Sequence, residues 1–180
     1  MLAIIFVLLI SIFLINFFAS KQMSGKVSIG GNFNLTNQYG KVYDSSIVKK
    51  KKLIYFGYTF CPDVCPFDIL KLSKLLDTKP DLTKKIEFIF ITVDPYRDNV
   101  TQIKSFLDNF NSSIIGLTGS QKQIDDVVKN FRIFVKINGD LNDPNYLIDH
   151  SGLFFLIDEN DNYISHFRPD DFKFNIDKYF

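Results

Sequence analysis

Few cysteines, few histidines and almost no excess charge limit what this 180-residue chain can do. It has two cysteines and two histidines, and 21 basic against 20 acidic side chains leave a net charge of +1. Because such a chain has no strong positive field to attract a polyanion, we do not expect it to bind nucleic acid. It has no internal repeat and no low-complexity segment. With 46% apolar residues it can bury one core, which predicts a single folded domain.

The amino terminus lacks charge altogether, since residues 1–20 have no acidic or basic side chain. A helix of this length is about 30 Å long, the thickness of a bilayer core, so these residues are predicted to form a transmembrane anchor. A secretory signal would have a basic start and a shorter apolar region. Lys21 and Lys26 follow the span and, taken alone, would place the rest of the chain in the cytoplasm. The absence of an Arg-rich amphipathic leader favours a bacterial membrane over an organellar one.

Beyond the anchor we expect a linker over residues 21–31 and one domain over residues 32–180. Alternating segments flank a turn at residues 38–40 and predict an N-terminal hairpin. Three continuous apolar runs then alternate with segments of helical periodicity, as expected of buried strands covered by helices on both faces. The last third reads as antiparallel strands, followed by a closing helix over residues 171–180. The predicted fold class is therefore α/β, a mixed sheet flanked by helices. The apolar runs are LIYFGY, EFIFITVDP and IIGLTG, and the late strands are RIFVKI, YLIDHS, GLFFLID and YISHFR.

Both cysteines lie in the short stretch FCPDVCPFD, between the first apolar run and the helix after it. This places Cys61 and Cys65 at the carboxyl edge of the sheet, where open α/β folds commonly bind ligands. Pro66 suits the first helical position, because its missing N–H would be unpaired there. Thiols at a helix amino terminus have lowered pKa values, so the pair is predicted to be reactive. The lysine run at residues 49–52, just before this strand, is expected to guard a sheet edge or lie in a solvated turn.

The spacing of the two cysteines leaves three interpretations open: a disulfide, a redox pair or a metal site. A disulfide would close a very small loop and gain little from chain entropy. Two thiolates with the imidazole of His150 would form a three-coordinate soft site that suits Cu(I). A structural zinc site normally has four ligands, and no fourth cysteine or histidine is near in sequence. The other histidine, His166, is expected to be an ordinary strand residue.

Three motifs in order, FGYTFCPDVCP, ITVDPYRD and YLIDHSGLFFLID, resemble the Sco/SenC family of membrane-anchored, thioredoxin-like copper proteins. The resemblance extends over roughly residues 30–167. It implies a thioredoxin-like fold and copper binding by Cys61, Cys65 and His150. It also implies delivery of copper to the binuclear centre in subunit II of cytochrome c oxidase. The domain would then face the periplasm from a bacterial inner membrane, against the charge argument above, and the site would need a thiol reductant in that oxidising compartment.

A thiol-disulfide oxidoreductase that reduces the cysteines of the copper acceptor is the alternative, and it leaves an enzymatic activity open. Thioredoxin-type enzymes have two residues between their cysteines and a cis-proline before a later strand. Three residues intervene in this chain, and YLIDHS contains no proline. Three acidic residues are secondary candidates. Asp63 would orient the cysteine loop or contact a partner, Asp94 would tune the site or fix its own turn, and Asp149 would hold the His150 ring.

Overall fold

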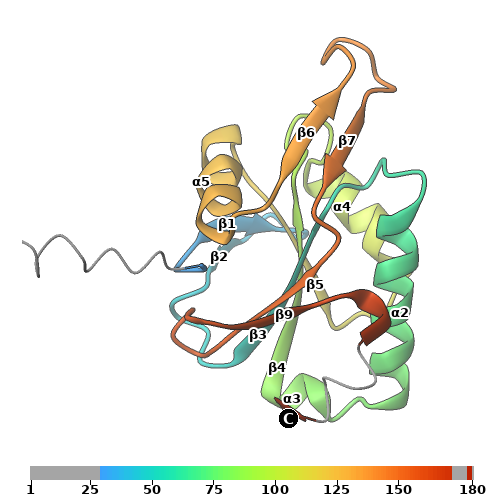
Figure 1. Cartoon of the computed structure of the whole chain (residues 1–180). Coiled ribbons are helices and arrows are strands. Elements are labelled where there is room, and N and C mark those ends of the chain that lie inside the picture. Colours follow the sequence, from blue (N-terminus) through green and yellow to red (C-terminus); the bar gives the residue numbers. More distant parts are fainter. Residues whose placement is uncertain (1–28, 172–177, 180) are drawn as a thin grey trace, which may run out of the picture.

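The computed structural model describes residues 29–171 together with Lys178 and Tyr179 (Figure 1). Its helices and strands follow one another in chain order with short connections. The elements are β1 (Asn34–Asn37), β2 (Val42–Asp44), β3 (Lys51–Gly57), α2 (Val64–Thr78), α3 (Leu82–Lys85), β4 (Ile86–Thr92), α4 (Val100–Leu107), β5 (Ile114–Thr118), α5 (Gln121–Phe131), β6 (Val135–Asn138), β7 (Leu147–His150), β8 (Phe154–Ile157), β9 (Tyr163–Phe167) and the 3-10 turn η1 (Pro169–Asp171).

The framework is one seven-stranded sheet with the order β2-β1-β5-β4-β3-β8-β9. Strands β3, β4 and β5 are parallel at its centre. The antiparallel pair β1–β2 borders β5, and the antiparallel pair β8–β9 borders β3. The predicted mixed α/β sheet is thus confirmed. Because β3, β4 and β5 are parallel, their carboxyl ends lie at the same edge, and the loops after these strands meet there.

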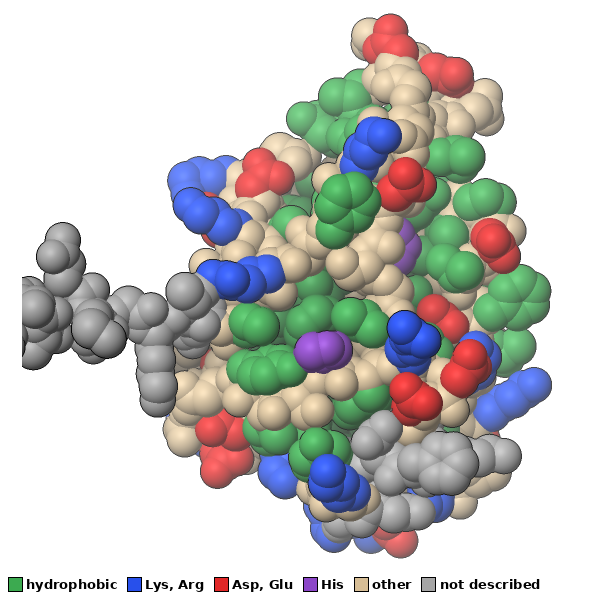
Figure 2. Space-filling model, viewed as in Figure 1, with side chains coloured by type: hydrophobic (Ala, Val, Ile, Leu, Met, Phe, Trp, Pro, Cys, Tyr) green, Lys and Arg blue, Asp and Glu red, His purple; other side chains and the backbone are tan. Residues whose placement is uncertain are grey.

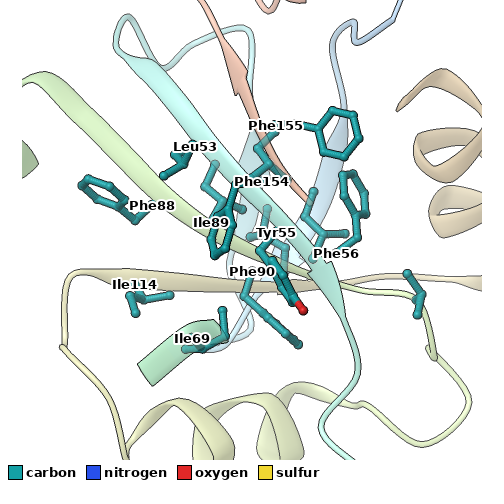
Figure 3. Close-up of a cluster of buried hydrophobic side chains, with 14 of the residues drawn as sticks. Leu53, Tyr55, Phe56, Ile69, Phe88, Ile89, Phe90, Ile114, Phe154 and Phe155 are labelled. Atoms are coloured by element: carbon teal, nitrogen blue, oxygen red, sulfur yellow. The ribbon is translucent and has the colours of Figure 1, made fainter. Parts of the chain in front are cut away.

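Aromatic side chains on both faces of β3 form the centre of the core (Figure 3). Tyr55 points to one face, where its ring centroid lies 4.7 Å from that of Phe154 and 6.4 Å from that of Phe90. Phe56 points to the other face, 5.3 Å from the ring of Phe131 on α5. Both β3 side chains are fully buried. A strand covered on both faces needs apolar residues at every position, which explains the continuous run in the sequence.

The helices divide between the two faces of the sheet (Figure 1). α2 and α4 share one face. There the backbone N–H of Asn111, just beyond α4, donates to the Ser73 hydroxyl of α2 at 2.8 Å. α5 covers the other face and begins with a capping box between Ser120 and Gln123. The predicted N-terminal hairpin is confirmed as β1–β2, with Gly40 at φ +73° in its turn.

The prediction for the lysine run was wrong at Lys52. This residue lies inside β3 and is fully buried, with its ammonium nitrogen 2.7 Å from the Asp161 carboxylate. The same nitrogen donates to the Val48 carbonyl at 3.0 Å. A buried ammonium is tolerated only with such a counter-charge and hydrogen bonds, and the partner comes from the distant β8–β9 turn.

The four late strands are present, but only β8 and β9 join the main sheet. β6 and β7 form a separate two-stranded sheet that projects beyond the domain (Figure 1). The reason is topological, because β8 already pairs with the free side of β3 and β9 extends that side. β6 and β7 therefore pair with each other, and His150 is the last residue of this projecting hairpin.

Three predictions concern residues that lie wholly or mostly outside those that the structure describes. The anchor over residues 1–20 and most of the linker lie before residue 29, and most of the closing helix falls in residues 172–177. Within residues 29–171 and 178–179, no helix is long and apolar enough to cross a membrane.

Candidate metal centre

The cysteine loop connects β3 to α2 and places both thiols at the start of the helix. α2 begins at Val64, so Cys65 is its second residue and Pro66 its third rather than its first. The first four N–H groups of a helix have no partner within the helix, which is why a proline is still tolerated at this position. Both cysteines are free thiols. Cys61 is half-buried, and Cys65 is completely buried.

His150 meets the cysteine pair although it is 85 residues from Cys65 in sequence. Its Nε2 atom lies 3.0 Å from the Cys65 sulfur. The two sulfurs and one imidazole nitrogen all lie within 4.8 Å of one another. The His150 Nδ1 atom is 3.3 Å from the Ser151 carbonyl, which can only accept a hydrogen bond. The other ring nitrogen, Nε2, faces the thiols.

Several contacts hold the projecting hairpin against the cysteine loop. The Tyr58 hydroxyl accepts a hydrogen bond from the amide of Ile148, which lies in the middle of β7. Tyr146, just before β7, donates its hydroxyl to the Asp94 carboxylate, which also pairs with Arg97 at 2.6 Å. The Arg97 guanidinium lies 3.5 Å from the Tyr146 ring centroid, within the range of a cation–π contact. These contacts set the distance between His150 and the thiols.

The two thiols differ in proton affinity. A hydrogen bond from Cys65 lowers the pKa of Cys61 to about 3, and contacts from His150 and from the amides of Asp63 and Cys65 act in the same direction against the cost of burial. The same thiol–thiolate bond, followed by burial, raises the pKa of Cys65 above its usual range. The predicted lowering therefore holds for Cys61 and is wrong for Cys65. At neutral pH the pair is one thiolate and one thiol that share a proton.

The three secondary candidates lie near the site in different ways. Asp63 is the residue before α2, makes no side-chain capping bond, and lines the open cleft beside Cys61. Asp149 is exposed and lines the same cleft, while the His150 ring uses the Ser151 carbonyl. Asp94 is buried and binds Arg97 and Tyr146, so it fixes its own loop and the base of the hairpin.

The remaining histidine is not near the thiols, and three other residues near the site were not predicted. His166 is exposed on β9, where it contacts the Tyr163 hydroxyl. Tyr55 and Tyr58 enclose His150 edge-on, with ring centroids 6.2 and 5.9 Å away. Asp98 binds the loop residue Thr59 from behind. Tyr58 stands within the FGYTFCPDVCP motif and Tyr55 immediately precedes it, and this proximity is the one sequence signal that would have suggested them.

The site opens into a cleft of about 350 Å³. Its walls are residues from the cysteine loop and from β7: Tyr58, Cys61, Pro62, Asp63, Val64, Leu147, Ile148, Asp149 and His150. Hydrophobic side chains gather on the α2 side of this face, and acidic ones lie at the tip of the hairpin (Figure 2). Val64 and Leu147 are about half exposed at the rim, at 48% and 47%. An apolar rim around a reactive site is typical of a surface that meets another protein.

Two sulfurs and one imidazole nitrogen are the soft donors that suit Cu(I). Among the described residues, no further cysteine, histidine or carboxylate joins this group of three. A closed four-ligand zinc site would need another donor. A mixed sheet with a thiol pair at its carboxyl edge and a histidine facing it defines a thioredoxin-like, metal-binding class of protein.

Comparisons with known proteins support this class and identify the family. A family model described as SCO1/SenC matches residues 21–176. An SCO2-like protein of Rickettsia conorii is 42% identical over 146 residues, which cover 80% of this chain and 71% of that protein. The copper-bound structure of Bradyrhizobium japonicum ScoI is 35% identical with a TM-score of 0.76, over 85% of this chain and 100% of that one. Copper-bound yeast Sco1 is 33% identical with a TM-score of 0.76, over 84% and 86%.

This chain belongs to the SCO1/SenC family. The two solved relatives described above hold copper, and the three converging donors are chemically suited to it. The predicted family and the predicted metal are therefore confirmed.

Proposed function

We propose that this chain is a membrane-anchored copper metallochaperone. It binds Cu(I) through Cys61, Cys65 and His150 and delivers the ion to the binuclear copper centre of cytochrome c oxidase subunit II. The observation that carries the proposal is the convergence of two sulfurs and one imidazole nitrogen within 4.8 Å at an open cleft. The Sco family is associated with cytochrome c oxidase assembly. Subunit II as the acceptor and a periplasmic location on a bacterial inner membrane follow from the family resemblance and the apolar residues 1–20.

Copper capture needs little rearrangement. Cys61 is already a thiolate, and the His150 Nε2 atom faces the site. Cys65 loses its proton as its sulfur binds the metal, so capture at neutral pH releases about one proton from the thiol pair. The ordinary loss for two free thiols would be about two. Holding the donors in place before the metal arrives reduces the ordering cost of binding.

Copper release follows by ligand exchange without a change of oxidation state. A three-coordinate ion leaves room for an acceptor thiolate, which enters from the cleft side. Each sulfur–copper bond formed on the acceptor replaces one on this chain, and the released Cys65 thiolate takes up a proton again. The apolar rim at Val64 and Leu147 is suited to contact the acceptor at this stage. A thiol reductant is needed only to restore the pair after oxidation to a disulfide.

A thiol-disulfide oxidoreductase remains the second candidate, and the unequal thiols favour it. The half-exposed Cys61 thiolate attacks an acceptor disulfide and forms a mixed disulfide, releasing one acceptor thiolate. Cys65 then gives up its proton, attacks Cys61 and releases the second acceptor thiolate. The acceptor gains two electrons, and this chain ends as the Cys61–Cys65 disulfide. His150 provides neither a bond nor an electron in this sequence, so the two functions differ in their need for it.

The test is an anaerobic Cu(I) titration of the reduced full chain in detergent, in competition with a chromophoric chelator. Wild type is compared with His150→Ala and with the matched control His166→Ala. One-to-one binding that weakens by about tenfold or more in His150→Ala and is unchanged in His166→Ala supports the metallochaperone. If His150→Ala binds Cu(I) as tightly as wild type and His166→Ala do, His150 is excluded as a ligand. The oxidoreductase would then become the better account, provided that His150→Ala still reduces a disulfide substrate.

A further inference from the structure

A buried carboxylate lies directly behind the cysteine loop. Asp98, in the loop that follows β4, is completely buried. Its Oδ2 atom accepts the backbone N–H of Thr59 at 2.9 Å and the hydroxyl of Thr92 at 2.6 Å. Its Oδ1 atom accepts the hydroxyl of Thr59 at 2.5 Å. Three donors thus converge on one carboxylate, and two of them come from a single residue of the cysteine loop.

This carboxylate is held without a cation. Among the described residues Asp98 has no ion-pair partner, because the neighbouring Arg97 pairs with Asp94. Burial raises the pKa of Asp98, and the hydrogen bonds from Thr59 and Thr92 oppose that rise. A buried carboxylate without a counter-charge is costly, so its hydrogen bonds must supply the compensation. An apolar side chain at this position would leave the three donors unpaired.

Backbone hydrogen bonds fix Asp98 to its own turn and to β5. Its amide donates to the Asp94 carbonyl at 2.9 Å, just beyond β4. Its carbonyl accepts the hydroxyl of Thr118, the last residue of β5, at 2.7 Å. Through its carboxylate and its backbone carbonyl together, Asp98 therefore connects the first part of the cysteine loop to β4 and β5. Thr59 stands two residues before Cys61, close enough for its position to determine where the Cys61 sulfur lies.

We propose that Asp98 is a positioning residue for the copper site. Through Thr59 it holds the loop so that the Cys61 sulfur faces both Cys65 and His150. Without this support the loop moves away from the hairpin, and one donor is lost from the set of three. The inference rests on the proposed function, because it assigns Asp98 a role in the same site.

The test compares Asp98→Ala with the near-isosteric Asp98→Asn in the full chain in detergent. The asparagine oxygen accepts from the Thr59 amide and the Thr92 hydroxyl, while its NH₂ donates to the Thr59 hydroxyl, so the geometry is retained without the charge. The alanine variant leaves all three donors unpaired. We expect Asp98→Ala to lose about tenfold to a hundredfold in Cu(I) affinity, the usual cost of removing an outer support of a metal site. Asp98→Asn retains affinity within about threefold of wild type.

A second measurement separates positioning from a purely structural role. X-ray absorption at the copper edge reports the number of ligands, which should fall from three to two in Asp98→Ala and stay at three in Asp98→Asn. If folded Asp98→Ala keeps three ligands and wild-type affinity while its thermal midpoint falls, the proposal is overturned. If Asp98→Ala does not fold, Thr59→Val replaces it, since it removes only one donor. A loss of Cu(I) affinity in Thr59→Val, smaller than that expected for Asp98→Ala, supports the proposal. Wild-type affinity and three copper ligands in Thr59→Val overturn it.

Failure of copper binding and failure of the Asp98 role give different results. Should wild type bind no Cu(I), the proposed function fails, and positioning is tested on the metal-free protein. The ratio of dithiol to disulfide is then measured for Cys61 and Cys65 in glutathione buffers. If this ratio differs from wild type by about threefold or more in Asp98→Ala and equals the wild-type value in Asp98→Asn, Asp98 positions the two cysteines. Equal ratios in all three proteins overturn it.

Discussion

The low pKa of Cys61 depends on its neighbour, and this dependence can be tested by two substitutions at Cys65. The hydrogen bond from Cys65 is the largest cause of the low value. Cys65→Ala removes the donor, whereas Cys65→Ser replaces the thiol with a hydroxyl that still donates. The pKa of Cys61 should therefore rise by about 2 pH units or more in the alanine variant and rise much less in the serine variant. Contacts from His150 and the Asp63 amide remain in both.

The size of the effect determines which assay is suitable. With a pKa of about 3, Cys61 is ionised to roughly 99% at pH 5, compared with about 0.03% for a thiol of pKa 8.5. A thiolate of such low basicity is also a weaker nucleophile, by a few hundredfold over this range of pKa. The two factors act in opposite directions, so a rate measured at one pH does not by itself report the pKa. The shape of the pH profile is the reliable quantity.

The assay is alkylation of the metal-free, reduced protein by iodoacetamide from pH 3 to pH 9. Cys65 is completely buried, so the reaction reports Cys61, and Cys61→Ala should show almost no modification. The wild-type rate should be nearly constant above pH 5, because the thiolate is already formed. The alkylation rate of Cys65→Ala should increase about tenfold per pH unit until the pH reaches the raised pKa of Cys61. A wild-type rate that rises through pH 8, or identical profiles for the alanine and serine variants, would refute the reasoning.

Two further predictions concern stability, and both are measured by denaturant unfolding. Gly116→Ala should lower the free energy of unfolding by about 1–3 kcal/mol, because a Cβ on β5 would overlap the Ile103 and Leu107 side chains of α4. An unchanged denaturation midpoint would show that α4 shifts to make room without cost. Lys52→Ala should cost about 3–5 kcal/mol, because it leaves the Asp161 carboxylate buried without its cation. The double variant Lys52→Met, Asp161→Asn should recover much of that loss, and a double variant as unstable as the single one would contradict this account.

Local patterns in the sequence were enough for most of the fold. The apolar run around Tyr55 and Phe56 predicted a strand buried on both faces, because consecutive side chains of a strand point to opposite sides. The helical spacing of Ile69, Leu72 and Leu76 predicted α2, and these residues are buried in it. The turn between a buried strand and a helix placed the cysteines at the carboxyl edge of the sheet. These inferences need only neighbouring residues, so one sequence suffices.

Other features depend on contacts between distant segments. The pairing of β6 with β7 rather than with the main sheet depends on β8 occupying the edge of β3. The buried charge of Lys52 depends on Asp161, more than a hundred residues away. A local pattern contains no information about which strand takes an edge or which carboxylate meets a lysine. The sequence interpretation was wrong at Lys52 for this reason.

The sequence by itself determined the elements, the position of the thiol pair and, through three ordered motifs, the family. Only the tertiary structure decided that His150 Nε2 lies 3.0 Å from Cys65, that Cys61 holds the charge while Cys65 holds the proton, and that Asp98 supports the loop. Residue types and periodicity are properties of short stretches of chain. Donor distances, burial and proton affinity arise where separate stretches are packed together, and they exist only once the chain has folded.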